Sequence, residues 1–231
     1  MLVVSNIDLT EELKTMKPSE FLDSSPKGFT ININNDYRYL KAGYYVSLHA
    51  EVLGNRVIPS SENIIDSSRT PILLLRAARA GVATLPFVVT DSVKKIMTDV
   101  GLPAVIFAVN PFIYDGFKVA HNKSGLYRAM KSLGMNYKFD VCAMPLKGEM
   151  RSVKSFFGKC PQGNSEVGDI SEKVYRLFRI PICKLHIQTV DGKAYLSGLQ
   201  PLKEEELASS DLELISNEIM LISQQGEHIG V

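Results

Sequence analysis

The stretch ICKLHIQTVDGKAYLSGLQPL, residues 182–202, places the strongest constraint on the fold of this 231-residue chain. Apolar and polar residues alternate on both sides of Asp191 and Gly192, which is the pattern of two half-buried strands. Asp-Gly is a preferred pair for a two-residue turn, because both central positions of that turn need a positive φ angle. The stretch therefore predicts an antiparallel β-hairpin in the last quarter of the chain.

Strand-like and helix-like patterns alternate along the rest of the chain. The run PAVIFAV, residues 103–109, is short and apolar, which suits a strand buried on both faces. The expected fold class is α/β (α+β), a mixed β-sheet covered by helices, with a C-terminal β-hairpin and a terminal helix. Further strands are expected at 29–34, 56–59, 85–89 and 139–146, and helices at 8–16, 71–80, 91–100, 126–134, 170–179 and 204–223.

From Thr70 onward these patterns change to longer helix and strand units, and we divide the chain into three segments. Residues 1–70 are expected to form a strand–helix–strand lobe, residues 71–150 a middle α/β segment, and residues 151–231 a helix–hairpin–helix segment. Because 45% of the residues are hydrophobic, the chain can bury a large core, and the segments are expected to pack as one globular unit.

Charge and composition exclude several classes of protein. The 26 Lys and Arg residues nearly balance 25 Asp and Glu, so we expect no nucleic-acid partner. No apolar run is long enough to span a membrane, and the N-terminus lacks the pattern of a secretory signal, so a cytoplasmic location is expected. The three cysteines, Cys142, Cys160 and Cys183, and the scattered histidines have no metal-ligand spacing, so we expect no metal site and cysteines that fill the core.

The stretch NNDYRYLKAGYYVSLHAEVLGN, residues 34–55, predicts a helix with four tyrosines. Asn34, Asn35 or Asp36 would cap it, and Gly54 would end it. At 100° per residue, one side collects small residues, and Gly43 in a helix interior indicates close packing against a sheet. That side contains Tyr39, Ala42, Gly43, Val46, Ala50 and Leu53.

The opposite side of this predicted helix is neither plainly solvated nor plainly apolar. It contains Tyr37, Lys41, Tyr44, Leu48 and Glu51, with Tyr45 and His49 toward its edge. Tyrosines can stack on a substrate or hydrogen-bond a carboxylate, and Lys41 would supply the counter-charge. The alternative is that a second layer or a partner covers this side, with the hydroxyl groups at its rim.

Two parts of the chain resemble the RimK-like ATP-grasp N-terminal domain family. The first is INNDYRYLKAGYYVSLHAEVLGNRVIPS, and the second is SFFGK followed by ISEKVYRLFRIPICKLHIQTVDGKAYLSGLQPL. The resemblance implies a mixed helix and sheet domain that usually precedes an ATP-grasp ligase joining carboxylates to amines. Because the sequence ends at Val231, with no room for a full ligase module after the domain, we expect a departure from that architecture. The signature positions of the family fall on Tyr37, Tyr39, Gly43, Tyr44, Tyr45, Ser47 and Glu51.

Residues 76–133 are similar in outline to the nucleotide-binding half of ATP-grasp enzymes. Such a site needs a lysine at the end of a strand to neutralise phosphate charge, glycines that let backbone N–H groups approach phosphates, and acidic and Asn ligands for Mg²⁺. Here the strand position reads Phe107, and LSGLQP stands where the ligases have Glu-x-Asn. The nucleotide-binding candidates that remain are Arg69, Gly116 and Lys118.

Three readings of function follow. The first is an accessory, substrate-binding protein of a separately encoded ATP-grasp ligase, which would hold an amino acid, peptide or other small molecule with Tyr37, Lys41, Tyr44, Tyr45, Ser47 and Glu51. The second is a diverged ATP-dependent ligase using ATP and Mg²⁺, or a catalyst using Tyr44, Ser47 or Glu51. The third is a non-enzymatic interaction protein whose tyrosine side forms a homo-oligomer interface. No cofactor is required by the first or the third.

Overall fold

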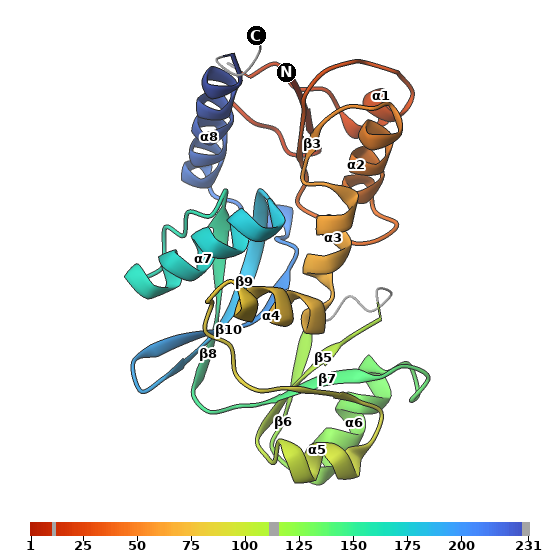
Figure 1. The fold of residues 1–231 in the computed structure, drawn as a ribbon, viewed down its shortest axis with the longest axis vertical. Coiled ribbons are helices and arrows are strands. Elements are labelled where there is room, and N and C mark those ends of the chain that lie inside the picture. Colours follow the sequence, from red (N-terminus) through yellow and green to blue (C-terminus); the bar gives the residue numbers. More distant parts are fainter. Residues whose placement is uncertain (11–12, 111–115, 228–231) are drawn as a thin grey trace.

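The structure, a computed structural model, describes residues 1–10, 13–110 and 116–227 (Figure 1). Helices and strands alternate along these residues, so the predicted α/β class is confirmed. The helices are α1 (Pro18–Leu22), α2 (Ala42–Val52), α3 (Ser61–Ser68), α4 (Thr70–Arg79), α5 (Val93–Asp99), α6 (Lys123–Leu133), α7 (Ser165–Phe178) and α8 (Ser209–Glu227), with a short 3-10 helix at Glu204–Glu206.

The strands within the described residues form three sheets, one parallel and two antiparallel. The parallel sheet has the order β1 (Leu2–Ser5), β2 (Thr30–Ile33), β3 (Val57–Ile58). The middle sheet has the order β4 (Val88–Thr90), β7 (Val141–Pro145), β5 (Ala104–Ala108), β6 (Phe117–Ala120). The third sheet has the order β10 (Lys193–Gln200), β9 (Ile182–Val190), β8 (Glu149–Phe156).

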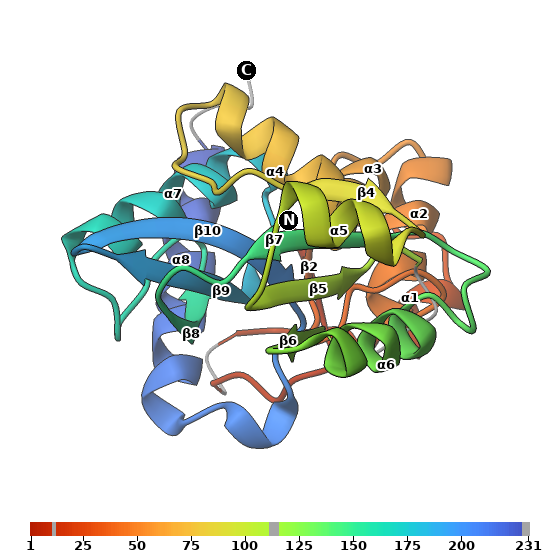
Figure 2. The ribbon, with the colours of Figure 1, turned by 90° about the horizontal axis from the view of Figure 1, so that it is seen from below.

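The predicted hairpin is confirmed as β9 and β10. Asp191 and Gly192 both have positive φ angles, 49° and 80°, as the two-residue turn requires. The pairing shifts register between Leu196 and Gly198, which is a β-bulge. Figure 2 shows this sheet and the middle sheet side by side when the molecule is seen from below.

The strand β5 is buried on both faces, as its continuous apolar run predicts. Ala104 and Ile106 pack with α5 and α6 on one face of the middle sheet. Val105 and Phe107 point the other way, into the largest hydrophobic cluster of the described residues. That cluster also contains side chains from the first and third segments, so the three expected segments share one core; how they divide into domains stays a prediction.

Two of the sequence predictions differ from the structure, and several elements were not predicted. The helix predicted at 8–16 is wrong for its described residues, because the Met16 backbone instead hydrogen-bonds to Val3 and Ser5 of β1. Residues 11–12 of that prediction lie outside the described part. The terminal helix begins at Ser209 rather than 204, since residues 204–206 form the 3-10 helix. The sequence patterns also missed β1, β6, β8, α1 and α3.

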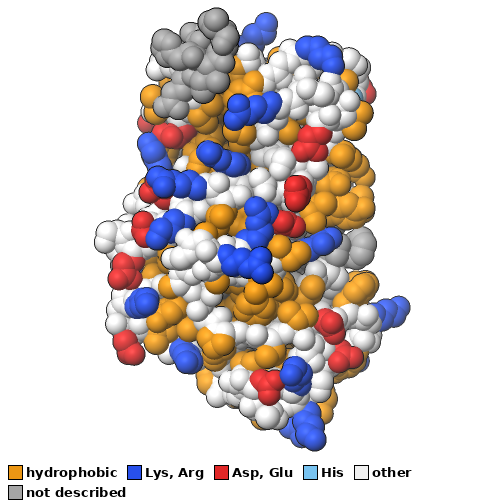
Figure 3. Space-filling view, in the orientation of Figure 1, with side chains coloured by type: hydrophobic (Ala, Val, Ile, Leu, Met, Phe, Trp, Pro, Cys, Tyr) orange, Lys and Arg blue, Asp and Glu red, His pale blue; other side chains and the backbone are white. Residues whose placement is uncertain are grey.

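On the face shown in Figure 3, Lys and Arg side chains are intermingled with Asp and Glu, so neither sign of charge dominates it. Among the described helices, none combines the length and the apolar character that a membrane span requires.

Candidate functional site

The tyrosine segment enters its helix later than its sequence predicts. The helix α2 begins at Ala42 with Lys41 as its N-cap, so the predicted start near residue 37 is wrong. The residues before it form a turn in which the Arg38 N–H donates to the Asp36 carboxylate at 3.0 Å. Leu40 has a φ angle of 67°, in the left-handed region that a leucine rarely adopts. This turn separates Tyr37 and Tyr39 from the tyrosines of the helix.

The close packing predicted for Gly43 is confirmed. Gly43, Val46 and Ala50 are buried against the parallel sheet. A Cβ atom at residue 43 would lie 2.6 Å from the Asp36 carbonyl oxygen, so glycine is required there. Tyr39 and Ala42, predicted for the same side, are instead exposed. Tyr39 precedes the helix, and Ala42 is its first residue.

Tyr37 is part of the core rather than of an open helix face. Its ring is 6% exposed, its hydroxyl donates to the Asn32 carbonyl at 2.8 Å, and it accepts from the Asn34 N–H at 2.9 Å. Burial raises the pKa of Tyr37 above its ordinary value. The hydroxyl therefore fixes the end of β2 and stays protonated near neutral pH.

Replacing Tyr37 with phenylalanine is expected to lower the free energy of unfolding by about 1–2 kcal/mol, because the buried Asn34 N–H loses its acceptor. Urea denaturation measures the change. The matched control is Tyr45→Phe at a ring that is 40% exposed, with an expected effect within about 0.5 kcal/mol. Equal effects at both positions would contradict the role given to the Tyr37 hydroxyl.

Ser47 and Glu51 form hydrogen bonds to neighbouring segments of the chain, and their predicted role in substrate binding stays a prediction. The Ser47 hydroxyl donates to the Pro59 carbonyl at 2.6 Å and accepts from the Asn32 amide at 2.8 Å. The Glu51 carboxylate accepts from both the backbone N–H and the hydroxyl of Ser61, at the start of α3. Both side chains therefore hold α2 against β2, β3 and α3.

The other aromatic residues of the segment form a row on the surface. Tyr39 meets Tyr44 edge-to-face at 5.2 Å between ring centroids, and Tyr44 meets Tyr45 at 5.7 Å. Lys41 beside them is exposed. The predicted role of Lys41, Tyr44 and Tyr45 in substrate binding stays a prediction.

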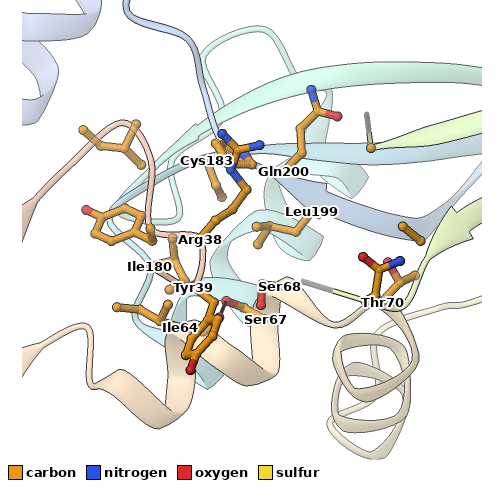
Figure 4. A pocket seen from close by; sticks show the side chains of 16 residues that line it. Arg38, Tyr39, Ile64, Ser67, Ser68, Thr70, Ile180, Cys183, Leu199 and Gln200 are labelled. Carbon is orange, nitrogen blue, oxygen red and sulfur yellow. Dashed lines mark hydrogen bonds between the residues drawn. The ribbon is translucent and has the colours of Figure 1, made fainter. Parts of the chain in front are cut away.

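A pocket lies between the turn that precedes α2 (residues 37–39), α3, the end of β5 and the hairpin. We call it the central pocket (Figure 4). Its volume is about 80 Å³. Figure 4 shows Arg38 and Gln200 toward one end, Ser67 and Ser68 toward the other, and Leu199 between them. Its lining residues are Tyr37, Arg38, Tyr39, Ile64, Ser67, Ser68, Thr70, Ala108, Asn110, Gly116, Ile180, Ile182, Cys183, Leu199, Gln200 and Pro201.

Arg38 is the charged side chain in the lining of the central pocket. Its guanidinium Nε donates to the Asp36 carboxylate at 2.8 Å. The amide of Asn110 donates to the Leu133 carbonyl at 2.9 Å, which ties the pocket wall to α6. An apolar middle with a cation, amides and hydroxyl groups around it suits a small amphipathic ligand.

Of the three nucleotide-binding candidates, only Gly116 lines the central pocket. Arg69 is exposed at the N-cap of α4 and lines a different hollow with Phe139 and Asp140. The Lys118 ammonium group donates to the Ser132 hydroxyl at 2.8 Å, on α6. The structure thus does not bring the three candidates together in the central pocket.

The position where the ATP-grasp pattern has its lysine is closed by packed rings. Phe107 is 2% exposed and lies 5.6 Å from Phe117 and 6.4 Å from His186, measured between ring centroids. A Cβ atom on Gly198 would come within 2.8 Å of the Phe107 ring. Within the described residues no group of three His, Cys, Asp or Glu side chains could hold a metal ion. At this position the chain therefore offers an apolar ring in place of a cation for a phosphate group.

His186 lies at the centre of this ring cluster and was missed by the sequence reasoning. It is 1% exposed; its Nε2–H donates to Gln200 Oε1 at 2.8 Å, and its Nδ1 accepts from the Ser152 hydroxyl at 2.9 Å. Burial lowers the pKa of His186 to about 4; the Gln200 hydrogen bond opposes the shift and the charge of Lys184 adds to it. The imidazole ring is therefore neutral near pH 7. Its hydrogen bond to Gln200 holds it in the ring cluster.

Two of the cysteines fill the core, as predicted. Cys142 and Cys183 are buried, and burial raises the pKa of both thiols to about 12. A thiol that stays protonated is a poor nucleophile. Cys160 is partly exposed, and all three are free thiols.

The sheets, their covering helices and the central pocket define a protein with the ATP-grasp fold. The structure is similar to the D-alanine–D-alanine ligase from Bacillus anthracis complexed with ATP, with a TM-score of 0.64 and 14% identity over 97% of this chain and 98% of that chain. A RimK domain ATP-grasp protein from Sphaerobacter thermophilus DSM 20745 gives a TM-score of 0.61 and 8% identity over 87% and 91%. The D-alanine–D-alanine ligase from Helicobacter pylori gives a TM-score of 0.56 and 15% identity. The alignment covers 77% of this chain and 64% of that chain.

The sequence identifies the particular family. Residues 19–218 match the RimK-like ATPgrasp N-terminal domain, and the chain belongs to that family. The match runs through the middle segment, so the likeness covers more of the chain than the two quoted motifs. A comparison with curated proteins finds no match.

Proposed function

We propose that this protein binds the amino-acid or peptide substrate of a separately encoded ATP-grasp carboxylate–amine ligase and acts as its accessory partner. The observation that carries the proposal is an ATP-grasp fold in which a buried Phe107 occupies the position that the resemblance assigns to a phosphate-binding lysine, while the central pocket, which is lined by the neighbouring Ala108, retains polar groups. Such a pocket can hold a small molecule without transferring a phosphoryl group to it.

The composition of the central pocket supports this choice of ligand. Arg38, which is held by an ion pair with Asp36, brings positive charge for a carboxylate, and the hydroxyl oxygens of Ser67 and Ser68 can accept hydrogen bonds from an ammonium group. Leu199 and Ile180 supply an apolar surface for a side chain. An amino acid or a short peptide presents these three features together.

A diverged ATP-dependent ligase is the second candidate. It is supported by the length of the structural similarity, since 97% of the chain aligns with a ligase that was solved with ATP. The packing of Phe107 against His186 and Phe117 speaks against it, because an apolar cluster replaces the lysine and the metal ligands that phosphoryl transfer needs.

Thermal unfolding with free amino acids and dipeptides tests the first candidate. We expect at least one compound at about 10 mM to raise the midpoint of unfolding, because a ligand that binds only the folded state stabilises it. Leu199→Trp fills the pocket and is expected to abolish the shift. The control Leu75→Trp, on a side chain that is 53% exposed and outside the pocket lining, is expected to retain it.

Calorimetry with ATP separates the two candidates. The accessory role predicts no binding heat at about 1 mM ATP with Mg²⁺. Binding of Mg²⁺-ATP tighter than this, with no response to any amino acid or dipeptide, would favour the diverged ligase and overturn the accessory role.

A further inference from the structure

The region from β6 to the turn after α6 carries charge of one sign. Residues 116–139 contain five Lys and Arg residues and no Asp or Glu. The whole chain has 26 basic and 25 acidic residues, so the remainder has four more acidic than basic residues. The five cations are Lys118, Lys123, Arg128, Lys131 and Lys138, and none of them forms an ion pair with a described residue.

Three of these cations surround one open, shallow cleft of about 540 Å³, which we call the α6 cleft. Its lining residues are Arg128, Lys131, Ser132, Met135, Asn136 and Lys138. A fourth cation, Lys118, reaches its edge through the hydrogen bond to Ser132. Asp140, the next acidic residue in the sequence, lines a separate hollow.

The turn that closes the α6 cleft is strained and firmly held. Met135, Asn136 and Tyr137 have consecutive left-handed φ angles of 51°, 58° and 63°. Residues other than glycine rarely adopt such angles. The Lys138 N–H donates to the Gly134 carbonyl at 2.8 Å, and the Tyr137 hydroxyl donates to the Tyr127 carbonyl at 3.1 Å. Conformations of this kind persist where the surrounding structure enforces them, often at binding surfaces. The turn holds Lys138 beside the cations of α6.

Exposed apolar side chains flank the cations. Met135 lines the α6 cleft, and Tyr127 and Tyr137, which are joined by a hydrogen bond, lie on α6 and on the turn; all three are between 39% and 45% exposed. An occupant that neutralises the cleft therefore needs acidic groups for the cations and apolar groups for these side chains. A peptide in which acidic and apolar residues alternate has both.

The extent of the surface favours a short peptide over a nucleic acid. The 11 residues of α6 span about 16 Å, which accommodates only a few residues of an extended chain. A longer polyanion would run beyond the α6 cleft, and the rest of the chain, with 21 basic and 25 acidic residues, has no net positive charge to hold it. We propose that the α6 cleft docks a short segment of a partner protein that is rich in acidic residues interleaved with apolar ones.

This proposal stands apart from the proposed ligand of the central pocket, because no residue lines both cavities. Fluorescence anisotropy of the full chain with a labelled six-residue peptide of alternating glutamate and leucine tests it. We expect binding that weakens as salt is added, since counter-charges are screened. The triple variant Arg128→Glu, Lys131→Glu, Lys138→Glu is expected to weaken binding at least tenfold.

Matched variants and probes separate the outcomes. The control Lys14→Glu, Arg79→Glu, Lys147→Glu changes the net charge equally at exposed positions outside the α6 cleft, and it is expected to alter binding less than twofold. The neutral pair Arg128→Gln, Lys131→Gln, checked for folding by circular dichroism, is expected to weaken binding severalfold. Absence of binding, equal loss in the control, or equal or tighter binding of a 12-nucleotide single strand would overturn the proposal.

Discussion

Replacing Gly43 with alanine is expected to lower the free energy of unfolding by about 2–3 kcal/mol. The added Cβ would meet the Asp36 carbonyl oxygen at 2.6 Å and Cβ of Asn34 at 3.0 Å. The first contact is with backbone in a turn fixed by its own hydrogen bonds, so α2 would have to move away from β2. The better helix propensity of alanine, worth about 1 kcal/mol, offsets only part of this cost. Urea denaturation measures the difference.

The same substitution at Gly168 is the matched control. Gly168 lies inside α7, and a Cβ atom there would meet nothing within 4 Å. Gly168→Ala is therefore expected to stabilise the protein by about 1 kcal/mol through helix propensity alone. If both substitutions shift stability in the same direction, the contact between α2 and the turn is not the cause.

Acidification below about pH 6.5 is expected to destabilise the protein through His186. Because its pKa is about 4 in the folded state and about 6.5 in the unfolded state, the unfolded state binds more protons between these values. The free energy of unfolding therefore falls as the pH falls through this window. The full loss from this residue, reached below about pH 4, is about 3 kcal/mol.

Comparison of variants isolates this contribution from that of the carboxylates. His186→Gln keeps a polar side chain near Ser152 and Gln200 but cannot take up the proton, so its stability is expected to fall less between pH 7 and pH 4. His121→Gln, at an exposed residue, is expected to keep the slope of the unchanged protein. Denaturation curves across this range measure both slopes. Parallel slopes for His186→Gln and the unchanged protein would show that burial of His186 does not depress its pKa.

The elements that could be predicted from the sequence are those specified by local patterns. The hairpin at Asp191 and Gly192, the buried strand β5 and the helix α4 each carry their own turn, run or cap signal. β8 carries a weaker signal, because polar residues occupy most of its positions before the buried end at Phe156. The helix start at residue 37 failed for a different reason. A tertiary contact, the hydrogen bonds of the Tyr37 hydroxyl to β2, prevailed over good N-cap residues.

The central pocket could be predicted only in part, because it is assembled from segments far apart in the sequence. Tyr37, Tyr39 and Gly116 were singled out from motif positions, and all three line it. Arg38 and Gln200 were not, since a single arginine or glutamine has no local pattern that marks it as part of a pocket. The pairing of β9 with β10 and the packing of both against β5 bring Gln200 to Gly116.

The strand β5 has a consequence for how the molecule comes apart. Its alternate side chains belong to two cores, one with α5 and α6 and one shared with the first and third segments. Separating the middle sheet from the rest would leave Val105 and Phe107 in water, while loosening α6 would expose Ala104 and Ile106. Unfolding of either core weakens β5, which the other core also contains. The strand β5 therefore couples the two cores into one cooperative unit of unfolding.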